Sequence, residues 1–590
     1  MDTFLENLFA ALNEHMPEAS SAIFAYITFF IRLLLPILAV VIIYRCVISF
    51  LREKPDQETW GCVSLPNGTK VPLNHWENTI GRSKSSDIYL DYPTLSRKHA
   101  AIIRNADGEW TVYDLESKGG VYVNHQRIEE PTMIFAGDVI SLGGVDLVFL
   151  PHGEYEEREQ ARGRKLAGRI VNPKGIFIYL TEFQILLCAQ LCIAYADDFR
   201  MCIPISFGIL IAITWAYYIF MRLLSRTGFE VEIIAFFLTT IGLGIVASSS
   251  PDGLYKQLFC FIAGLVIFLI LGWFLRDLDR AKKLRWPIAI AGVILLGVNL
   301  VIAEVSYGAK NWISIAGFSV QPSEFVKICF VFAGAATLDR LFTKRNLLLF
   351  IAFSGVCVGA LALMSDFGTA LIFFVTYLVI AYLRSGDIST IFLSGAGAGF
   401  AGFIALQVKP YIASRFSSWG KAWEFMNDSG YQQTRTMAAA ASGGLLGVGA
   451  GNGWLKGIFA ADTDMVFGCV CEELGLIIGA LAVLSIVALA VFSIWSAETA
   501  RSSFYIIGAC AASSILVFQT LLNVCGSVDI LPFTGVTFPF VSKGGSSMMA
   551  CWGLMAFIKA ADTRQNASFA IRLPKKFRSR VREVEAFEEY

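Results

Sequence analysis

Charge is scarce in this sequence. Only 16% of its 590 residues are Asp, Glu, Lys or Arg, whereas 55% are hydrophobic. Soluble domains carry roughly 25% charged residues, so the composition excludes an ordinary soluble protein and predicts a chain with several membrane spans. Basic and acidic residues number 48 each. No excess of either sign points to a partner, and we expect no nucleic acid among the partners.

Two further features are missing. The 13 cysteines lie mostly in apolar runs, and none of their spacings resembles a zinc site, so we interpret them as thiols of the core. Residues 1–22 lack the basic start of a secretory signal peptide. We therefore expect the first apolar run, from Ile23 to Phe50, to be a retained anchor. Arg52 and Lys54 follow it, and the positive-inside rule places them in the cytoplasm.

Apolar runs recur along the chain, each close to the ~20 residues that a membrane helix needs. With the anchor we expect about thirteen spans. The others lie at 175–196, 201–224, 229–248, 257–276, 286–305, 325–341, 344–364, 367–384, 390–408, 467–495, 502–527 and 540–560. In this order the basic loops and the tail "KKFRSRVR" share the cytoplasmic side. The loop from 409 to 466 then lies outside.

Composition changes along the chain predict most of the segment boundaries, and the boundary between 228 and 229 is implied by the motif resemblance given below. Residues 55–152 are polar, with short strand-like runs and the turn signals "PNG", "NADG" and "KGG", which predict a small soluble β domain. The expected segments are an anchor (1–54), the β domain (55–152), a charged linker (153–172), two further spans (173–228), a membrane core (229–562) and a basic cytoplasmic tail (563–590).

The β domain carries a specific set of motifs. "TIGRSKSSDIYLDYPTLSRKHAAI" is followed by "YDLESKGGVYVN" and "GDVISLG". This pattern resembles that of forkhead-associated (FHA) domains, which implies an all-β sandwich whose loops bind phosphothreonine. The resemblance places Arg82 and Ser96 on the phosphate, with Arg97 beside them. A guanidinium fork and a hydroxyl suit phosphate oxygens. We expect His99 to be a buried hydrogen-bonding residue that shapes the loop.

One position departs from the FHA pattern. The family usually has Asn-Gly-Thr where this chain has Gly119, Gly120 and Val121. That asparagine normally holds the backbone of the bound peptide, so its loss puts peptide affinity in doubt. The alternative interpretation is an interaction module that binds no phosphate.

Five further motifs follow in the second half of the chain. They are "GAKNWISIAGFSVQPSEFVKI", "MSDFGTA", "GYQQTRTMAAAASGGLLGVGAGNGWLKG", "DTDMVFGCVCEELG" and "LPFTGVTFPFVSKGGSS". Together they resemble the SEDS family (shape, elongation, division and sporulation), which includes FtsW, RodA and SpoVE. The resemblance covers about 229–562. It implies a mainly α polytopic membrane protein, with a ten-helix core, about three extra spans and the cytoplasmic FHA sandwich.

This resemblance implies a bacterial peptidoglycan glycosyltransferase. Such enzymes join lipid II units into glycan strands on the outer face of the cytoplasmic membrane, usually beside a class B penicillin-binding protein that cross-links the strands. Asp464 matches the position of the family's essential aspartate. A carboxylate there can act as general base on the attacking sugar hydroxyl, which is typically worth ~10²–10⁴-fold in rate.

The leaving undecaprenyl pyrophosphate needs a cation. The candidates are Lys310, Arg415 and Lys456, with Lys421 as a further one, and the first two best match family positions. A divalent ion, Mg or Mn, near Asp462 and Asp464 is an open alternative, and no other cofactor is expected. Polar residues of the motifs are expected to bind substrate or support the site: Gln321, Ser323, Glu324, Asp366 and Gln432.

The acids near Asp464 leave other interpretations open. Asp462 could itself be the working acid. Thr463 and Asp464 could cap the following helix, because Thr and Asp suit a helix N-terminus. Glu472 and Glu473 lie inside the expected span, where they could orient helices or hold a neighbouring cation.

Two acids of the earlier motifs also have structural interpretations. Glu324 could pair with Lys327, three residues further along the same helix. Asp366 could close a polar network at a helix end.

The chain departs from the SEDS pattern at four positions. Asn311 stands before the tryptophan of "NWI", where an arginine is common. Asp462 replaces a histidine, Met465 replaces a phenylalanine, and Lys543 replaces the tyrosine before the final Gly-Gly. These changes leave the pyrophosphate site less defined and keep a weakly active member among the alternatives.

Two other functions compete with the enzyme. A lipid II flippase would move the substrate without forming a bond, and intramembrane acids often mark such a path. A catalytically weak scaffold would only hold the penicillin-binding protein. The FHA domain would recruit or regulate any of the three through a phosphothreonine protein.

Overall fold

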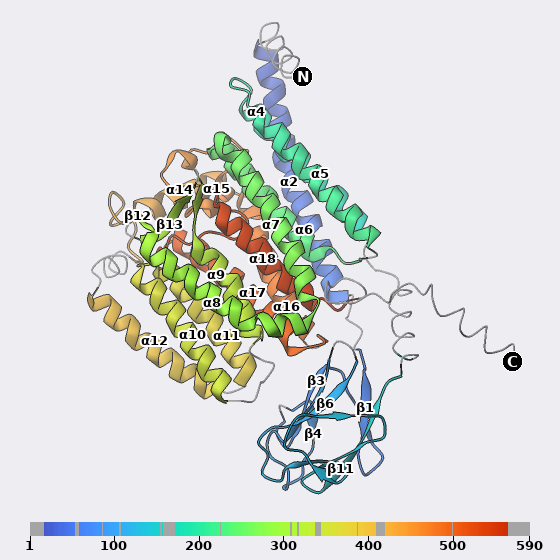
Figure 1. Ribbon diagram of the computed structural model, residues 1–590. Coiled ribbons are helices and arrows are strands. Elements are labelled where there is room, and N and C mark those ends of the chain that lie inside the picture. Colours follow the sequence, from blue (N-terminus) through green and yellow to red (C-terminus); the bar gives the residue numbers. More distant parts are fainter. Residues whose placement is uncertain are drawn as a thin grey trace, which may run out of the picture.

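The computed structural model describes residues 17–564, apart from 53–57, 85, 106–107, 154–155, 157–171, 225, 307–308, 316–317, 337–343, 386–387, 409–418 and 498. A helical bundle forms most of the chain, and a small β-sandwich lies beyond one of its ends (Figure 1). The expected fold class is confirmed.

Two sheets form the sandwich, as the alternating buried and exposed residues of the strands require. One sheet has the order β2-β1-β11-β10-β7-β8 and the other has the order β4-β3-β5-β6-β9. Their bounds are β1 (Gly61–Ser64), β2 (Lys70–Pro72), β3 (Glu77–Gly81), β4 (Ile88–Tyr89), β5 (Ala100–Arg104), β6 (Trp110–Asp114), β7 (Val121–Val123), β8 (Gln126–Arg127), β9 (Thr132–Ile134), β10 (Val139–Leu142) and β11 (Val145–Pro151). Only the β3–β4 pair among them is parallel.

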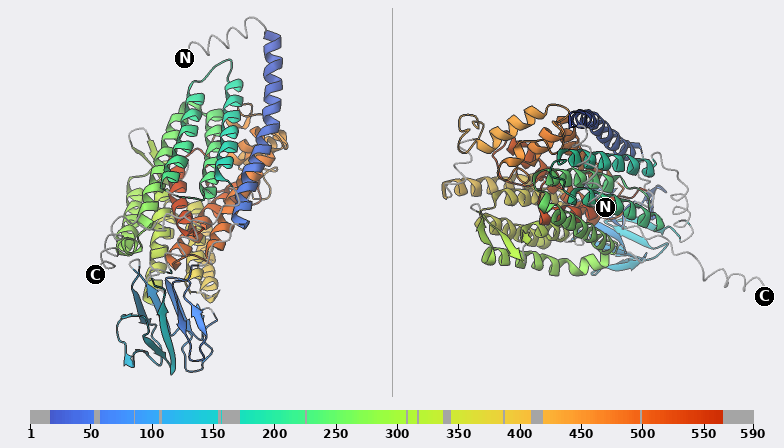
Figure 2. Two further views of the ribbon diagram at one scale, coloured as in Figure 1. Left: turned by 90° about the vertical axis from the view of Figure 1, so that its right-hand side faces the viewer. Right: turned by 90° about the horizontal axis from the view of Figure 1, so that it is seen from above.

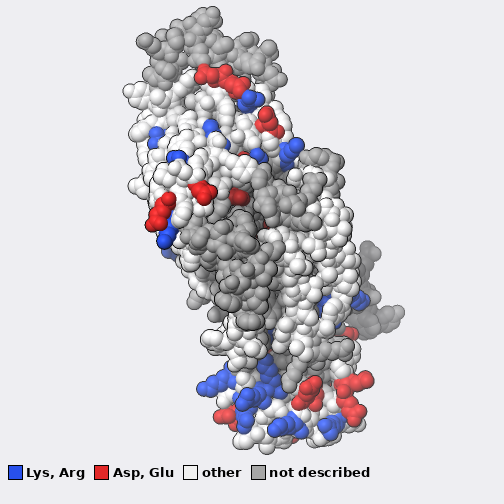
Figure 3. Space-filling view, turned by 90° about the vertical axis from the view of Figure 1, so that its left-hand side faces the viewer, with Lys and Arg blue, Asp and Glu red and all other residues white. Residues whose placement is uncertain are grey.

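Ten helices of the described chain are long and apolar enough to cross a membrane. With three others they account for the expected spans: α2 (Pro17–Arg52), α4 (Pro173–Ala194), α5 (Cys202–Leu223), α6 (Glu230–Ser249), α7 (Leu254–Leu275), α8 (Leu278–Ile302), α9 (Pro322–Ala336), α10 (Lys344–Leu363), α11 (Phe367–Ser385), α12 (Ile388–Val408), α16 (Leu476–Ala497), α17 (Ser503–Ser527) and α18 (Gly545–Ala561). Charged side chains gather toward the two ends of the face in Figure 3, and the belt between is largely uncharged where it is described. This is a multi-pass membrane protein.

The helices outside the expected core are packed onto it. α2 contacts α4, α6 and α16, and α4 also contacts α5 and α6. Figure 2 shows α2 lying along the outside of the bundle. The apolar window of α6 is completely buried, because these added helices cover the side that would otherwise face lipid.

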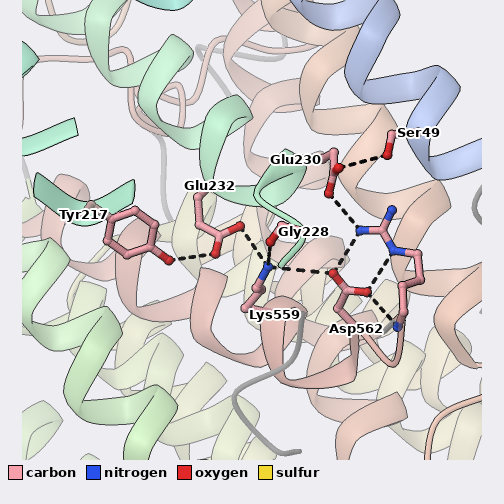
Figure 4. Close-up of polar contacts among 8 residues, drawn as sticks. Ser49, Tyr217, Gly228, Glu230, Glu232, Lys559 and Asp562 are labelled. Atoms are coloured by element: carbon pink, nitrogen blue, oxygen red, sulfur yellow. Dashed lines mark hydrogen bonds and ion pairs between the residues drawn. The ribbon is translucent and has the colours of Figure 1, made fainter. Parts of the chain in front are cut away.

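A buried network of charged residues joins α2 and α5 to the core helices α6 and α18 (Figure 4). Lys559 of α18 donates to Glu232 of α6 at 3.0 Å, and Tyr217 of α5 donates to the other oxygen of Glu232 at 2.7 Å. Arg564 binds Glu230 at 3.2 Å, and Ser49 of α2 donates to Glu230 at 2.9 Å. Charges buried away from water must be paired and hydrogen-bonded, so this network specifies how α2 and α5 sit against α6 and α18.

Several expected spans have different bounds in the structure, and α8, for example, begins at Leu278 and not at 286. The run 467–495 is two helices, α15 (Val466–Glu473) and α16, which separate at Gly475 with φ +93°. The run 540–560 becomes helical only at Gly545. The residues before Gly545 belong to an irregular segment that lies among the helix ends.

The remaining elements lie at the end of the bundle away from the β-sandwich (Figure 1). They are a three-stranded sheet of β12 (Glu304–Ser306), β13 (Ala309–Ile315) and β14 (Phe318–Val320), the helix α14 (Tyr431–Gly443), the short helix η3 (Leu455–Gly457) and α15. We refer to this end as the distal end. The sequence analysis had not predicted the small sheet.

Candidate functional site

Asp464 lies in a tight turn at the distal end. Ala460 has φ +60°, and its carbonyl accepts hydrogen bonds from the backbone N–H groups of Thr463 and Asp464 at 3.3 and 3.0 Å. The turn ends at Met465, the N-cap of α15, which has no side-chain cap hydrogen bond. Asp464 is half-buried. Met465, and neither Thr463 nor Asp464, therefore occupies the N-cap position of α15.

Three consecutive backbone carbonyls hold this turn in place. The carbonyl of Asp462 accepts from the N–H of Lys543 at 2.8 Å. The carbonyl of Thr463 accepts from Ser542 Oγ at 2.6 Å, and that of Asp464 accepts from Asn523 Nδ2 at 3.0 Å. Because each carbonyl has a separate partner, the backbone of the turn is fixed against α17 and the residues before α18.

Residues 534–547, hereafter the hub segment, contact polar residues from several of the motifs. Gly535 lies so close to Asp464 that a Cβ on it would be 3.2 Å from Asp464 Oδ2. Thr537 accepts a hydrogen bond from Gln519 at 2.9 Å, and Ser546 accepts one from the backbone of Gln321 at 3.3 Å. The motif "LPFTGVTFPFVSKGGSS" was identified in the sequence, but none of its residues was predicted as a site residue.

Glu324 and Lys327 form a buried ion pair at 2.7 Å, as their spacing had suggested. Lys327 also donates to Gln519 at 3.3 Å, which links the pair to the hub segment. Ser323 is fully buried, and its hydroxyl has no hydrogen-bond partner among the described residues. These residues support the hub segment from α9 and α17.

Asp366 collects a second polar group at the start of α11. It accepts from Asn311 Nδ2 at 2.5 Å, from Gln321 Nε2 at 3.5 Å and from the Thr369 N–H at 3.0 Å. Burial raises the pKa of the Asp366 carboxyl, and the hydrogen bonds from Thr369 oppose that rise. The network expected around Asp366 is present, and it includes Asn311.

Glu472 and Glu473 hold the glycine-rich loop before η3. Glu472 accepts from the N–H groups of Trp454 and Leu455 at 2.9 and 3.1 Å. Glu473 accepts from the Gly451 N–H at 3.0 Å and from a serine of α6. The two carboxylates therefore hold backbone N–H groups of this loop and of η3 in place.

The positively charged residues that were predicted to bind the pyrophosphate give little evidence for that role. Lys456 donates to the Gly451 carbonyl and lies 5.6 Å from the ring centroid of Tyr195, so its ammonium is engaged locally. The Lys310 side chain and Arg415 lie outside the described residues. Lys421 is exposed, in the turn-rich segment before α14.

Gln432 lies apart from the hub contacts given above. It donates to the Phe459 carbonyl at 3.3 Å, beside an open cavity of about 720 Å³ between α14 and η3. Tyr431, Trp454 and Asp428 also line this cavity. In the described chain, no three His, Cys, Asp or Glu side chains converge as a metal site.

The phosphothreonine candidates meet at one end of the β-sandwich. The Arg82 N–H donates to the Ser96 carbonyl at 3.0 Å, and Arg82 and Arg97 are exposed. Ser96 Oγ accepts from the Lys118 N–H at 3.1 Å. His99 is fully buried, with one ring nitrogen 3.2 Å from the Ser96 N–H and the other 3.1 Å from the Gly120 carbonyl. The expected role of His99 in shaping the loop is confirmed.

The opposite end of the sandwich is attached to the bundle, which sequence reasoning missed. Arg501, between α16 and α17, makes two hydrogen bonds to Glu58 at 2.6 and 2.8 Å. Its guanidinium lies 5.2 Å from the centroid of the Trp60 ring. Glu77, the first residue of β3, accepts from Ser502 at 3.0 Å and from Ser503. The loops that carry Arg82, Ser96 and Arg97 therefore project away from the bundle.

Comparison with known proteins identifies both parts. Residues 231–567 match the family model of the cell cycle proteins FtsW, RodA and SpoVE, and residues 78–143 match that of the FHA domain. RodA of Mycobacterium tuberculosis, a curated peptidoglycan glycosyltransferase, is 28% identical over 51% of this chain and 69% of its own length.

Two further relatives belong to the same group. The stage V sporulation protein E of Bacillus subtilis is 29% identical over 54% of this chain and 91% of its own length. The crystal structure of RodA from Thermus thermophilus is 21% identical, covers 56% of this chain and 95% of its own, and has a TM-score of 0.43. Because the family model covers more than half of the sequence, the chain belongs to the FtsW/RodA/SpoVE family of cell cycle proteins, with an added FHA domain.

Proposed function

We propose that this protein is a peptidoglycan glycosyltransferase that polymerises lipid II, with Asp464 as general base. The observation that carries the proposal is the convergence of the motif residues on a half-buried carboxylate. The hub segment contacts the Asp464 turn, α17 and β14–α9. Curated relatives in the same family are named peptidoglycan glycosyltransferases.

The proposed reaction joins two lipid-linked sugars. The 4-hydroxyl of one sugar attacks the anomeric carbon of the other, the new C–O bond forms, and undecaprenyl pyrophosphate leaves with the electron pair of the broken bond. Asp464 accepts the hydroxyl proton. A base with fixed position is worth ~10²–10⁴-fold, and the hydrogen-bonded carbonyls of the turn support such fixation.

The distal end would face outward, where lipid II is polymerised, and the FHA domain would be cytoplasmic. Support comes from the separation of the two ends by the uncharged belt (Figure 3). The proposed partners are a class B penicillin-binding protein, which would cross-link the strands, and a phosphothreonine protein.

The test is glycan polymerisation from purified lipid II by the full chain, with a class B penicillin-binding protein added. We expect polymer from the wild type and none from Asp464→Asn. Asp198→Asn is the control, because Asp198 is an exposed acid in the α4–α5 loop, paired with Arg200. Polymer from Asp464→Asn at the wild-type rate would contradict the proposal. Translocation of labelled lipid II without polymer would favour a flippase, and neither activity would favour a scaffold.

We also propose that the FHA domain binds phosphothreonine and thereby recruits or regulates the enzyme. The support is the exposed Arg82 and Arg97 beside Ser96. Pull-down of the full chain by phosphothreonine peptides tests this. We expect capture of the wild type and of the exposed-site control Lys70→Ala, and loss of capture with Arg82→Ala. Equal capture of Arg82→Ala would exclude the proposed phosphate site.

A further inference from the structure

Two of the positions at which this chain departs from the family pattern are in contact. Asp462 Oδ2 and Lys543 Nζ form an ion pair at 2.9 Å, although 81 residues separate them. The side chain of Asp462 is 16% exposed and that of Lys543 is 36% exposed. The carboxylate of Asp462 is therefore matched by the ammonium of Lys543.

The pair is held by a third segment, the end of α6. Ser249 Oγ donates to Asp462 Oδ2 at 3.0 Å, and Lys543 Nζ donates to Ser250 Oγ at 2.8 Å. The backbone of the same two residues is also joined, through the Lys543 N–H and the Asp462 carbonyl. The ion pair thus connects α6, the Asp464 turn and the hub segment.

Asp464 is two residues from one member of the pair. Ser542, next to Lys543, donates to the carbonyl of Thr463, between Asp462 and Asp464. Any displacement of Lys543 therefore moves a donor of the turn as well as the partner of Asp462. A partly buried ion pair with good hydrogen-bond geometry resists such displacement, because separating it leaves a desolvated charge.

We propose that the Asp462–Lys543 ion pair is a positioning device for Asp464. The proposal rests on the proposed function, in which Asp464 is the base. Neither member of the pair takes part in the reaction. Their charges fix the turn and the hub segment at the distance that the base requires.

The experiment compares single and double variants of the full chain. Asp462→Ala and Lys543→Ala should each lower kcat about 10²-fold, because a misplacement of ~1 Å costs about that much. KM for lipid II should change by less than about threefold. The charge reversal Asp462→Lys/Lys543→Asp should recover at least about tenfold of the loss.

A second double variant covers the case in which Ser249 and Ser250 cannot form hydrogen bonds with the reversed charges. Asp462→His/Lys543→Tyr installs the residues that the family favours at both positions, and we expect it to recover activity relative to either single variant. A recovery in both double variants or in one of them supports the positioning role. No recovery in either, with both variants folded, would overturn it.

Hydrogen exchange gives a readout that does not depend on catalysis. The amides of residues 463–465 and 542–543 should exchange faster in each single variant and return toward the wild-type rate in a recovered double variant. Unchanged exchange in the single variants would overturn the proposal. So would a rise of KM alone in Lys543→Ala, which would indicate substrate contact. If the wild type makes no polymer, the proposed function fails, and the exchange rates alone decide whether the pair fixes the turn.

Discussion

Gly535 shows how closely the hub segment approaches the proposed base. Its φ of +69° lies in the left-handed region, and a Cβ on it would lie 3.2 Å from Asp464 Oδ2. An L side chain at such a φ costs on the order of 1–3 kcal/mol. Glycine at this position therefore permits both the backbone conformation and the approach to the carboxylate.

We predict that Gly535→Ala lowers the polymerisation rate about 10²-fold, because the added methyl group displaces Asp464. Gly420→Ala is the matched control. Gly420 also has a positive φ, +73°, but a Cβ there meets nothing within 4 Å. It should therefore share the backbone strain and keep the activity. Equal rates for the two variants would show that the approach of Gly535 to Asp464 is unimportant. The measurement is the initial rate of polymer formation.

Gly119 is a residue-scale test of the FHA domain. A Cβ on Gly119 would meet its nearest atoms at 3.6 Å, an ordinary contact. We predict that Gly119→Asn folds normally and tightens phosphothreonine peptide binding, since the resemblance to FHA domains implies an asparagine here that holds the peptide backbone. One added hydrogen bond is worth about 1 kcal/mol, or roughly fivefold in Kd.

The adjacent glycine provides the control for this change. Gly120 has φ +70°, and a Cβ on it would lie 2.9 Å from Arg127 Nε. Gly120→Asn should therefore displace the Arg127 side chain and give no gain in peptide affinity. Isothermal titration with one phosphopeptide measures both variants. A Kd unchanged by Gly119→Asn would mean that this position does not hold the peptide.

At the scale of elements, α17 joins the two functional regions of the chain. Ser503, at its first residue, donates to Glu77 of the FHA domain, and Asn523 in its last turns donates to the Asp464 carbonyl. Asn523 also donates to the Val536 carbonyl at 2.7 Å. One amide thus connects α17, the Asp464 turn and the hub segment.

We predict that Asn523→Leu destabilises the distal end and lowers activity. The two carbonyls lose their donor, and an unsatisfied buried acceptor costs about 1–3 kcal/mol. Thr520→Val is the control on the same helix, because the Thr520 hydroxyl donates to the Leu516 carbonyl of α17 itself. Thermal unfolding in detergent should show a lower midpoint for Asn523→Leu than for Thr520→Val. Equal midpoints would argue against the role of Asn523.

The elements also show where sequence reasoning succeeds and where it stops. Long apolar runs and strand alternation depend on local composition, so the spans and the sandwich could be predicted. The break at Gly475 was not predicted, because apolar residues flank Glu472 and Glu473 and made the two helices resemble one span. Gly475 is needed there since a Cβ would lie 2.3 Å from the Leu445 carbonyl oxygen, in a loop distant in sequence.

The candidate site, like the fold, could be predicted only where it depends on local sequence. The motifs identified Asp464, Asp366 and Glu324, because the possible roles of these residues follow from their carboxylate side chains. The Asp462–Lys543 pair depends on a contact across 81 residues, and the Arg501–Glu58 pair depends on one across 443. No local sequence pattern reports contacts between residues so far apart in the chain.

At the scale of the whole molecule, the FHA domain is fixed to the bundle by one end and presents the proposed phosphothreonine-binding loops at the other. Arg501 and Glu58 are both buried, and Trp60 and Trp76 pack against the guanidinium. Breaking a buried ion pair by removing one partner costs about 3–5 kcal/mol. Loss of either partner should therefore loosen the attachment of the sandwich to the bundle.

We predict that Arg501→Ala detaches the FHA domain without weakening its ligand binding. Hydrogen exchange should increase at residues 58–60 and 75–77, whereas the Kd for a phosphothreonine peptide should stay within about twofold, because Arg82 and Ser96 lie at the far end of β3 from Glu77. Any effect of the peptide on the polymerisation rate should disappear. Lys70→Ala, an exposed residue of the sandwich, should behave as wild type in all three measurements. A tenfold loss of peptide affinity in Arg501→Ala would instead show that docking shapes the phosphothreonine site itself, and the two ends of the sandwich would then have to be treated as one unit.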